Sequence, residues 1–311
     1  MGYHYESSRP AKRRSATRQH RCGPDAMWSI VRSLSLVSLI SSACTATAQL
    51  SFVASVKQHG KDVDASSLRF VRIPPLEHRW HASRLRRGHN NRTVERDAVS
   101  YSANWCGASQ HAADEDGVKS VAGYFTAPDL TLRPDTPAPQ FAAAWIGIDG
   151  AECNTTLLQA GVTTIVNSDG GQSASAWWEW YPEASYTISG LKVKAGEWIS
   201  VNITTKDASS ATLVIDNLDS GMSVTLELNN GPQLCRRDAE WIVEDFYESG
   251  QQVALAHFAD LWFVDSGATT VRGKKVGFDG ATMVHLQDES GEILCSPEPY
   301  DNSNFVVVSR P

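Results

Sequence analysis

The stretch Ala239-Glu240-Trp241-Ile242-Val243-Glu244-Asp245-Phe246 combines strand-forming residues with three carboxylates. Because successive side chains of a strand point to opposite faces, the stretch divides into two sets. One face carries Glu240, Ile242, Glu244 and Phe246, and the other carries Trp241, Val243 and Asp245. A carboxyl group among apolar neighbours loses hydration, and its pKa rises toward the range of a general acid. The stretch is therefore either a solvated strand edge or the carrier of a functional carboxylate.

Short strands are predicted on both sides of this stretch, from about Val99 to the C-terminus, with no run that has the length and periodicity of an amphipathic helix. The predicted strands are residues 123–128, 141–148, 157–166, 174–181, 198–205, 211–215, 223–228, 240–246, 254–264 and 305–308. Predicted turns include Ser189-Gly190, residues 219–221 and residues 229–232. Many short strands at even spacing indicate an antiparallel β-sandwich or barrel.

The charge of the chain divides it into three parts. The 311 residues carry a net charge of −7, but residues 98–311 hold eleven Lys and Arg against twenty-eight Asp and Glu, a net charge of −17. Residues 1–48 hold seven basic against two acidic residues, and residues 49–97 hold ten against five. An acidic body of this kind repels nucleic acids and anionic membranes at neutral pH, so neither is an expected partner.

The N-terminal part has the pattern of a secretory signal. Residues 1–26 form a polar, basic extension, and Met27 is the expected start of translation. Residues 34–40 then form an apolar core, and a small-x-small site precedes cleavage after Ala48. The apolar run is too short to span a bilayer, so a secreted, extracellular protein without a membrane segment after cleavage is expected. Of six cysteines, Cys106, Cys153, Cys235 and Cys295 remain, which allows three disulfide connectivities and shows no spacing of a metal site.

Residues 49–97 are interpreted as a basic propeptide, with a flexible linker as the alternative. The segment contains Pro74-Pro75 and the dibasic pair Arg86-Arg87, a candidate processing site. The predicted organisation is thus an extension and signal peptide (1–48), a propeptide (49–97) and a catalytic domain (98–311). Sequons at Asn91, Asn154 and Asn202 predict a glycoprotein.

Three further stretches contain candidate binding residues. In residues 177–183 (WWEWYPE), Trp178 and Trp180 share one strand face, and Trp177, Glu179 and Tyr181 share the other. This aromatic strand indicates either a platform for an extended polymer or a core layer. Asp149 is either a turn residue or part of a carboxylate cluster, and Gln159 is a polar amide after two leucines.

Together these stretches resemble the eqolisin family, the fungal glutamic peptidases. The resemblance rests on five motifs in order: residues 101–108 (YSANWCGA), 144–150 (AWIGIDG), 158–161 (LQAG), 177–183 and 239–246. It covers nearly all of residues 99–311. The family resemblance implies a lectin-like, concanavalin-like sandwich of two bent antiparallel sheets, and peptide-bond hydrolysis without a cofactor or a metal.

Site residues follow from the same resemblance. It implies a catalytic dyad of Gln159 and Glu244, a cleft lined by Trp105, Trp145, Asp149 and Glu179, and a disulfide between Cys153 and Cys235. Cys106 and Cys295 are then left to each other by elimination. Many relatives carry an aspartate four residues after the catalytic glutamine, where this chain has Thr163.

The predicted function is a secreted, acid-active, pepstatin-insensitive glutamic endopeptidase made as a zymogen. Its expected partners are protein or peptide substrates and its own propeptide as an inhibitor, and it is expected to be a monomer. The alternatives are a secreted carbohydrate-binding sandwich module, in which the tryptophans form a sugar platform, and a glycosidase, which needs two carboxylates at one bond.

Overall fold

The computed structural model describes residues 49–75, 98–112 and 116–311. The predicted signal sequence and the arginine cluster between residues 84 and 96 lie outside these ranges. The described chain forms strands β1 to β23 and one short 3-10 turn, Ala65–Ser67, without any α-helix. Consequently no helix of these ranges is long and apolar enough to cross a membrane.

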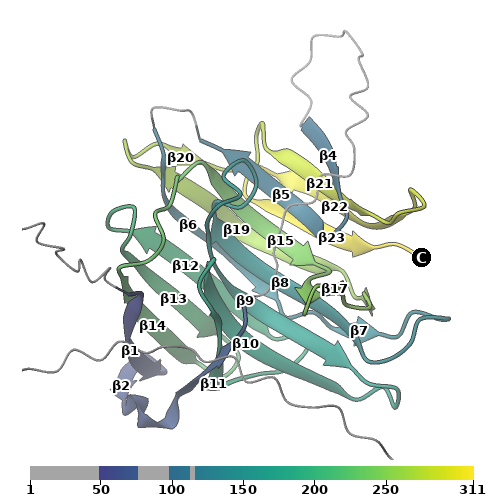
Figure 1. The fold of residues 1–311 in the computed structure, drawn as a ribbon, viewed down its shortest axis with the longest axis horizontal. Coiled ribbons are helices and arrows are strands. Elements are labelled where there is room, and N and C mark those ends of the chain that lie inside the picture. The colour runs from purple at the N-terminus through teal and green to yellow at the C-terminus, as the bar shows by residue number, and fades with distance from the viewer. Residues whose placement is uncertain (1–48, 76–97, 113–115) are drawn as a thin grey trace, which may run out of the picture. The chain divides into compact units, whose positions relative to one another are not determined.

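Nineteen of the strands form one hydrogen-bonded network that folds into two layers, joined through the pairing of β21 with β22 (Figure 1). The first layer consists, in spatial order, of β3 (Arg69–Ile73), β11 (Ser185–Val193), β10 (Gln172–Tyr181), β9 (Leu157–Val166), β8 (Gln140–Ile148), β15 (Asp238–Glu244), β5 (Trp105–His111), β21 (Thr282–Gln287) and β4 (Ala98–Ser102). The pairing of β21 with β4 is parallel, and the other strand pairs of the described chain are antiparallel.

The second layer packs behind the first. It consists of β2 (Lys61–Val63), β1 (Ser51–Gln58), β14 (Met222–Asn229), β13 (Ala211–Asn217), β12 (Trp198–Thr205), β6 (Val118–Thr126), β19 (Leu261–Thr270), β23 (Asn304–Ser309) and β22 (Ile293–Asp301), with β20 (Lys275–Val276) beside β19. Two small pairs lie outside the layers: β7 (Leu130–Thr131) with β18 (His257–Phe258), and β16 (Tyr247–Glu248) with β17 (Gln251–Gln252). The predicted antiparallel β-sandwich is confirmed.

The hydrophobic core lies between the two layers. Trp178 and Trp241 of the first layer join Ile203, Leu213 and Phe263 of the second in one buried cluster. A second cluster, which we call the outer cluster, lies on the opposite face of the first layer. Its buried members are Trp105, Ala143, Trp145, Leu157, Trp177, Ile242, Phe246 and Val284. The alternation predicted for residues 177–181 (β10) and for residues 239–246 (β15 and the residues after it) is therefore confirmed for their apolar side chains.

Strand β15 occupies a central position rather than an edge. It pairs with β5 on one side and β8 on the other, and all seven of its residues are buried. The interpretation of this stretch as a solvated edge is therefore wrong. The strand is also shorter than predicted, because it ends at Glu244, and Asp245 and Phe246 follow it outside the ladder.

Two disulfides fix the layers and the site. Cys106 on β5 bonds Cys295 on β22, and this bond connects the two layers. Cys153 bonds Cys235, which links the loop after β8 to the segment before β15. Both predicted pairings are confirmed.

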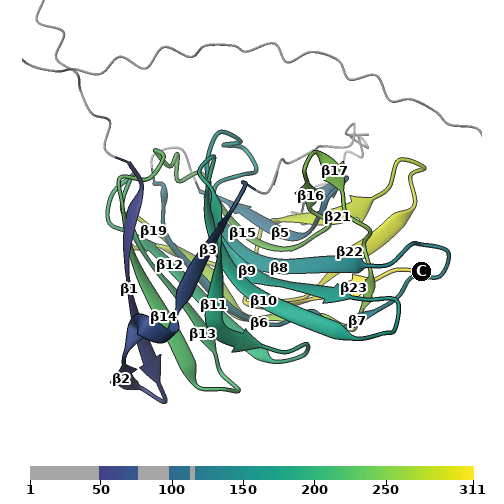
Figure 2. The same ribbon diagram turned by 60° about the horizontal axis from the view of Figure 1, so that its bottom comes forward.

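The structure departs from the prediction in three other places. Residues 49–75 contain β1, β2 and β3, and Figure 2 shows β3 beside β11. The alternating Phe52, Ala54 and Val56 carry the signal for β1, which the basic composition of the segment obscured. The predicted turn at Ser189-Gly190 lies inside β11, and the predicted strand 254–264 is divided between β18 and β19.

Candidate active site

Five strands of the first layer carry most of the predicted site residues on its outward face. Glu244 on β15 pairs in register with Trp105 on β5. Gln159 on β9 pairs with Gly147 on β8 and with Glu179 on β10. Because residues two apart on a strand share a face, this register collects side chains that are far apart in sequence onto one surface.

The carboxylate of Glu244 is completely buried, and within the described ranges three side-chain N–H groups donate to it. Asn104 Nδ2 donates to Oε1 over 3.1 Å, Trp105 Nε1 to the same oxygen over 3.2 Å, and Trp145 Nε1 to Oε2 over 2.9 Å. The two indoles meet edge to face, with ring centroids 5.0 Å apart. Because indole N–H groups only donate, they hold a carboxylate in one orientation.

Asn104 is a site residue to which the sequence analysis gave no role. Ser102 Oγ donates to Asn104 Oδ1 over 3.0 Å and accepts the backbone N–H groups of Asn104 and Trp105. This turn leaves the amide nitrogen of Asn104 facing Glu244, 140 residues away in the chain. Its place within the motif of residues 101–108 is the sequence feature that could have identified Asn104 as a site residue.

The side chain of Gln159 is buried and oriented by Glu179. Gln159 Nε2 donates to Glu179 Oε2 over 2.9 Å, and only the nitrogen end of the amide can donate to a carboxylate. Gln159 Oε1 has no hydrogen-bond partner within the part of the chain that the structure describes. The amide thus keeps one acceptor and one N–H for a molecule bound at the site.

Gly161 makes room for the indoles on this face. It pairs in register with Trp145 on one side and Trp177 on the other. A Cβ at this position would lie 2.1 Å from the Ala144 carbonyl oxygen and 2.6 Å from Trp145 Cβ. The glycine of the LQAG motif therefore has a steric role two residues from Gln159.

Asp149 lies apart from the contacts that hold Glu244 and Gln159. Its buried carboxylate accepts the backbone N–H groups of Arg236 over 2.9 Å and Arg237 over 2.7 Å. Burial raises its pKa to about 6, and those backbone donors oppose the rise. Asp149 also has a positive φ of 70°, so it serves as the turn residue that ends β8 and anchors the chain leading to β15.

Two other carboxyl groups of the opening stretch are buried. Burial raises the pKa of Glu240 well above its ordinary value, and the charges of Asp238 and Asp149 raise it further. Burial, followed by the charge of Glu244, likewise raises the pKa of Asp245. The expected rise of carboxyl pKa values in this stretch is thus found for Glu240 and Asp245.

Two groups of side chains in the described ranges have metal-ligand spacing. His111, Glu152 and Asp238 place one ligand atom each within 4.8 Å of the others. Both oxygens of Asp238 already have hydrogen-bond partners in the protein. Oδ1 lies 3.1 Å from His111 Nδ1, and Oδ2 accepts the N–H groups of Glu152 and Cys153. In the other group, Cys153 and Cys235 form a disulfide and are not available as ligands.

The chain is similar in sequence and in fold to known peptidases. The chain is 34% identical to aspergillopepsin-2 of Aspergillus niger over 212 residues, which are 62% of this chain and 73% of that protein. It is 31% identical to scytalidopepsin B of Scytalidium lignicola over 204 residues, 63% and 74% of the two chains. The crystal structure of scytalido-glutamic peptidase with a peptide-based transition-state analogue superposes with a TM-score of 0.58 at 26% identity, covering 67% of this chain and 98% of that one.

The family model agrees with these relatives. Residues 103–310 match the model of the Peptidase A4 family, so the predicted resemblance to eqolisins is confirmed. This result favours a peptidase over a carbohydrate-binding module or a glycosidase. The chain belongs to the Peptidase A4 family and is a glutamic peptidase.

Proposed function

We propose that the protein is a secreted acid endopeptidase in which Glu244 and Gln159 form the catalytic dyad. The observation that supports this assignment is that one face of the first layer holds both an oriented carboxylate and an amide with an acceptor atom that is not used. Glu244 is a buried carboxylate oriented by three N–H donors, and Gln159 is a buried amide with an oxygen that has no partner among the described residues. A base and an oxyanion donor are what hydrolysis of a peptide bond by water requires.

The proposed reaction needs no covalent intermediate. The Glu244 carboxylate removes a proton from a water molecule that Gln159 Oε1 holds, and the resulting hydroxide attacks the carbonyl carbon of the substrate. The second N–H of Gln159 Nε2 donates to the oxyanion of the tetrahedral intermediate. Glu244 then gives its proton to the leaving nitrogen as the carbon–nitrogen bond breaks. Glu179 holds the amide of Gln159 in the orientation that this sequence requires.

The substrate is proposed to be an unfolded or extended peptide segment bound along the outward face. Trp105, Trp145 and Glu179 lie on that face as buried side chains, and the scytalido-glutamic peptidase structure holds a peptide-based transition-state analogue. Asp149 remains a proposed binding residue, although both of its oxygens already accept backbone N–H groups. We also propose secretion after cleavage at Ala48, a zymogen with residues 49–97 as a basic propeptide, and a monomeric enzyme.

Substitutions test the dyad. Gln159→Ala removes the oxyanion donor and is expected to lower kcat by about 10²–10³. Glu244→Gln removes the base and the acid and is expected to lower kcat by at least about 10². Glu240→Gln is the matched control, because it changes a buried glutamate on the same face of β15, and activity in acid should persist.

The measurements are turnover of denatured protein at acid pH and circular dichroism of each variant. Near wild-type turnover of a folded Glu244→Gln or Gln159→Ala protein would refute the dyad. Pepstatin is expected not to inhibit, since no pair of aspartates is proposed to act, and tight inhibition by pepstatin would count against this mechanism.

A further inference from the structure

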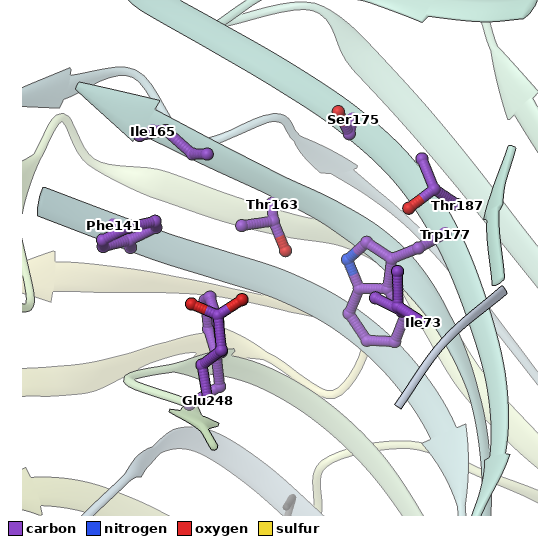
Figure 3. A pocket seen from close by; sticks show the side chains of 9 residues that line it. Ile73, Phe141, Thr163, Ile165, Ser175, Trp177, Thr187 and Glu248 are labelled. Carbon is purple, nitrogen blue, oxygen red and sulfur yellow. The ribbon is translucent and has the colours of Figure 1, made fainter. Parts of the chain in front are cut away.

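A pocket opens on the outward face of the first layer (Figure 3). Its volume is about 180 Å³, and its walls include Phe141, Thr163, Trp177, Phe246 and Ile73, with Glu248 at one side. A cavity of about 150 Å³ with apolar walls accommodates benzene. The pocket therefore has room for an aliphatic or aromatic side chain.

The register places this pocket within reach of a substrate bound at Glu244. Thr163 pairs with Ala143, and Ala143 pairs with Glu244, so the pocket wall lies two strands from the carboxylate. Two strand spacings are roughly 9–10 Å, and side chains on one side of an extended peptide recur about every 6–7 Å. A side chain one or two residues from the bond to be cut can thus enter the pocket.

One wall of the pocket comes from outside the predicted catalytic domain. Ile73 is the last residue of β3 and pairs with Ser185 of β11. Ser185 pairs with Glu179, and Glu179 pairs with Gln159, so Ile73 ends the row of residues that contains the proposed catalytic amide. Ile73 is partly buried and packs against the outer cluster.

The segment that carries Ile73 is integrated into both layers. β1 pairs along its whole length with β14, and β3 pairs along its whole length with β11. The ring of Phe52 lies 4.9 Å from that of Phe70, 5.1 Å from Trp178 and 5.4 Å from Tyr186, measured between centroids. A cut at Arg86-Arg87 leaves these two ladders and the aromatic contacts intact.

We propose that Ile73 is a specificity-determining residue, which forms a wall of the subsite for an aliphatic or aromatic substrate side chain. Residues 49–75 accordingly remain bound as part of the working peptidase after the chain is cut. This narrows the removable, inhibitory part of the proposed propeptide from residues 49–97 to their arginine-rich remainder. This inference rests on the proposed function, because it assigns a substrate subsite to the same face.

The first test compares substrate preference among variants of the full chain activated in acid. The probes are two sets of peptides. In one set the residue before the scissile bond is Ala, Leu, Phe or Trp, and in the other set the residue after the bond is varied in the same way. The wild type is expected to favour Leu or Phe over Ala at one of these positions. Ile73→Ala should raise kcat/KM for Trp relative to Leu, and Ile73→Phe should lower it for Phe relative to Ala, each by about tenfold. Val71→Ala is the control: Val71 shares the face of Ile73 on β3 but is 51% exposed and lies outside the pocket, so preference should not change.

Unchanged preference in both Ile73 variants would overturn the proposal. A uniform rise of kcat/KM for every peptide in Ile73→Ala would also overturn it, because β3 would then act as an inhibitor that blocks the face. These ratios are measured in active enzyme. If preference is unchanged in the Ile73 variants while Glu244→Gln still abolishes turnover, the subsite proposal is wrong and the proposed function stands.

The second test asks whether residues 49–75 remain bound to the catalytic domain after activation. The activated wild-type enzyme is passed through a size-exclusion column at acid pH, and the enzyme peak is analysed by mass spectrometry. A peptide that contains residues 49–75 is expected to co-elute with the catalytic domain. Fully active enzyme of wild-type preference without that peptide would overturn the proposal.

Discussion

At the scale of single residues, hydrogen bonds from two indoles distinguish Glu244 from the other acidic side chains of its strand. Trp105 and Trp145 carry their N–H groups to the two different oxygens, and Asn104 adds a third donor. Each indole also belongs to the outer cluster, so the same ring that packs against apolar neighbours orients the carboxylate. Packing and orientation can therefore be separated by a substitution that keeps a ring and removes only the N–H.

The substitution Trp145→Phe makes that separation. It removes the 2.9 Å hydrogen bond to Glu244 Oε2 and retains an aromatic ring, so kcat is expected to fall by about 10- to 100-fold. Trp241→Phe is the matched control, because its N–H donates to the Ala122 carbonyl oxygen and its ring lies in the core between the layers. The control should lower Tm without lowering kcat, and equal losses of kcat in the two variants would contradict the role of Trp145.

At the scale of elements, β15 and its surroundings concentrate buried carboxyl groups. The side chains of Asp238, Glu240 and Glu244 are buried on the strand, Asp245 follows it directly, and Asp149 lies at the end of the neighbouring β8. Neither oxygen of Glu240 has a hydrogen-bond partner of good geometry within the described ranges. Ser109 and the Ala151 backbone N–H oppose the rise of the Glu240 pKa, but burial exceeds their effect.

These groups make the stability of the sandwich depend on pH with a definite sign. The folded-state pKa values of Asp149, Glu240 and Asp245 are raised, so the folded protein holds protons that the unfolded chain has released. Their contribution to the free energy of unfolding is complete below the unfolded pKa values and is lost as pH rises through the folded values. For Asp149 the loss extends from about pH 4 to about pH 6 and amounts to about 3 kcal/mol. We therefore expect the folded protein to be more stable in acid than near neutrality, with these three carboxyl groups as a local cause.

The substitution Glu240→Gln tests this account. The amide cannot ionise, so the variant is expected to unfold at a higher temperature than the wild type at pH 7, by at least about 2–4 °C, which corresponds to about 1 kcal/mol in a domain of this size. At pH 3.5 both proteins are neutral at this position and their Tm values should agree. Thermal unfolding followed by circular dichroism at both pH values checks the prediction, and a difference independent of pH would refute it.

At the scale of the whole molecule, the charge divides along the chain. Residues 98–311 carry a net charge of −17, and residues 49–97 carry ten basic against five acidic residues. The described part of the basic segment pairs with the sheets as β1 to β3, and its clustered arginines lie beyond the described residues. Opposite charges attract near neutral pH, and protonation of the carboxylates in acid weakens the attraction.

A peptide that spans residues 76–97 is accordingly expected to inhibit the activated enzyme at the highest pH that still supports turnover. Inhibition should fall with added salt, because exposed charges are screened over about 8 Å at 0.15 M ionic strength. It should also fall with lower pH. The control peptide carries Gln in place of its arginines. Equal inhibition by both peptides, or none at micromolar concentration, would reduce this stretch to a linker.

The sequence by itself determined the faces of the strands and the class of the fold. Alternation in residues 177–181 and 239–246 predicted which side chains share a strand face, because the period of two is a local property of the strand. The family motifs identified Gln159 and Glu244 as candidates and led to both disulfides. In contrast, residues 49–75 were interpreted from their basic composition, and the three strands that they form were not predicted.

Only the tertiary structure decided which neighbours each outward residue has. Glu240 and Glu244 share a strand and a face, yet Glu244 receives two indole N–H groups and an amide N–H, while burial and nearby carboxylates raise the pKa of Glu240. Asn104, 140 residues from Glu244, and Ile73 of β3 reach the site region through strand pairing. The physical reason is that register across a sheet depends on how distant strands pack and pair, and no local pattern in either strand contains that information.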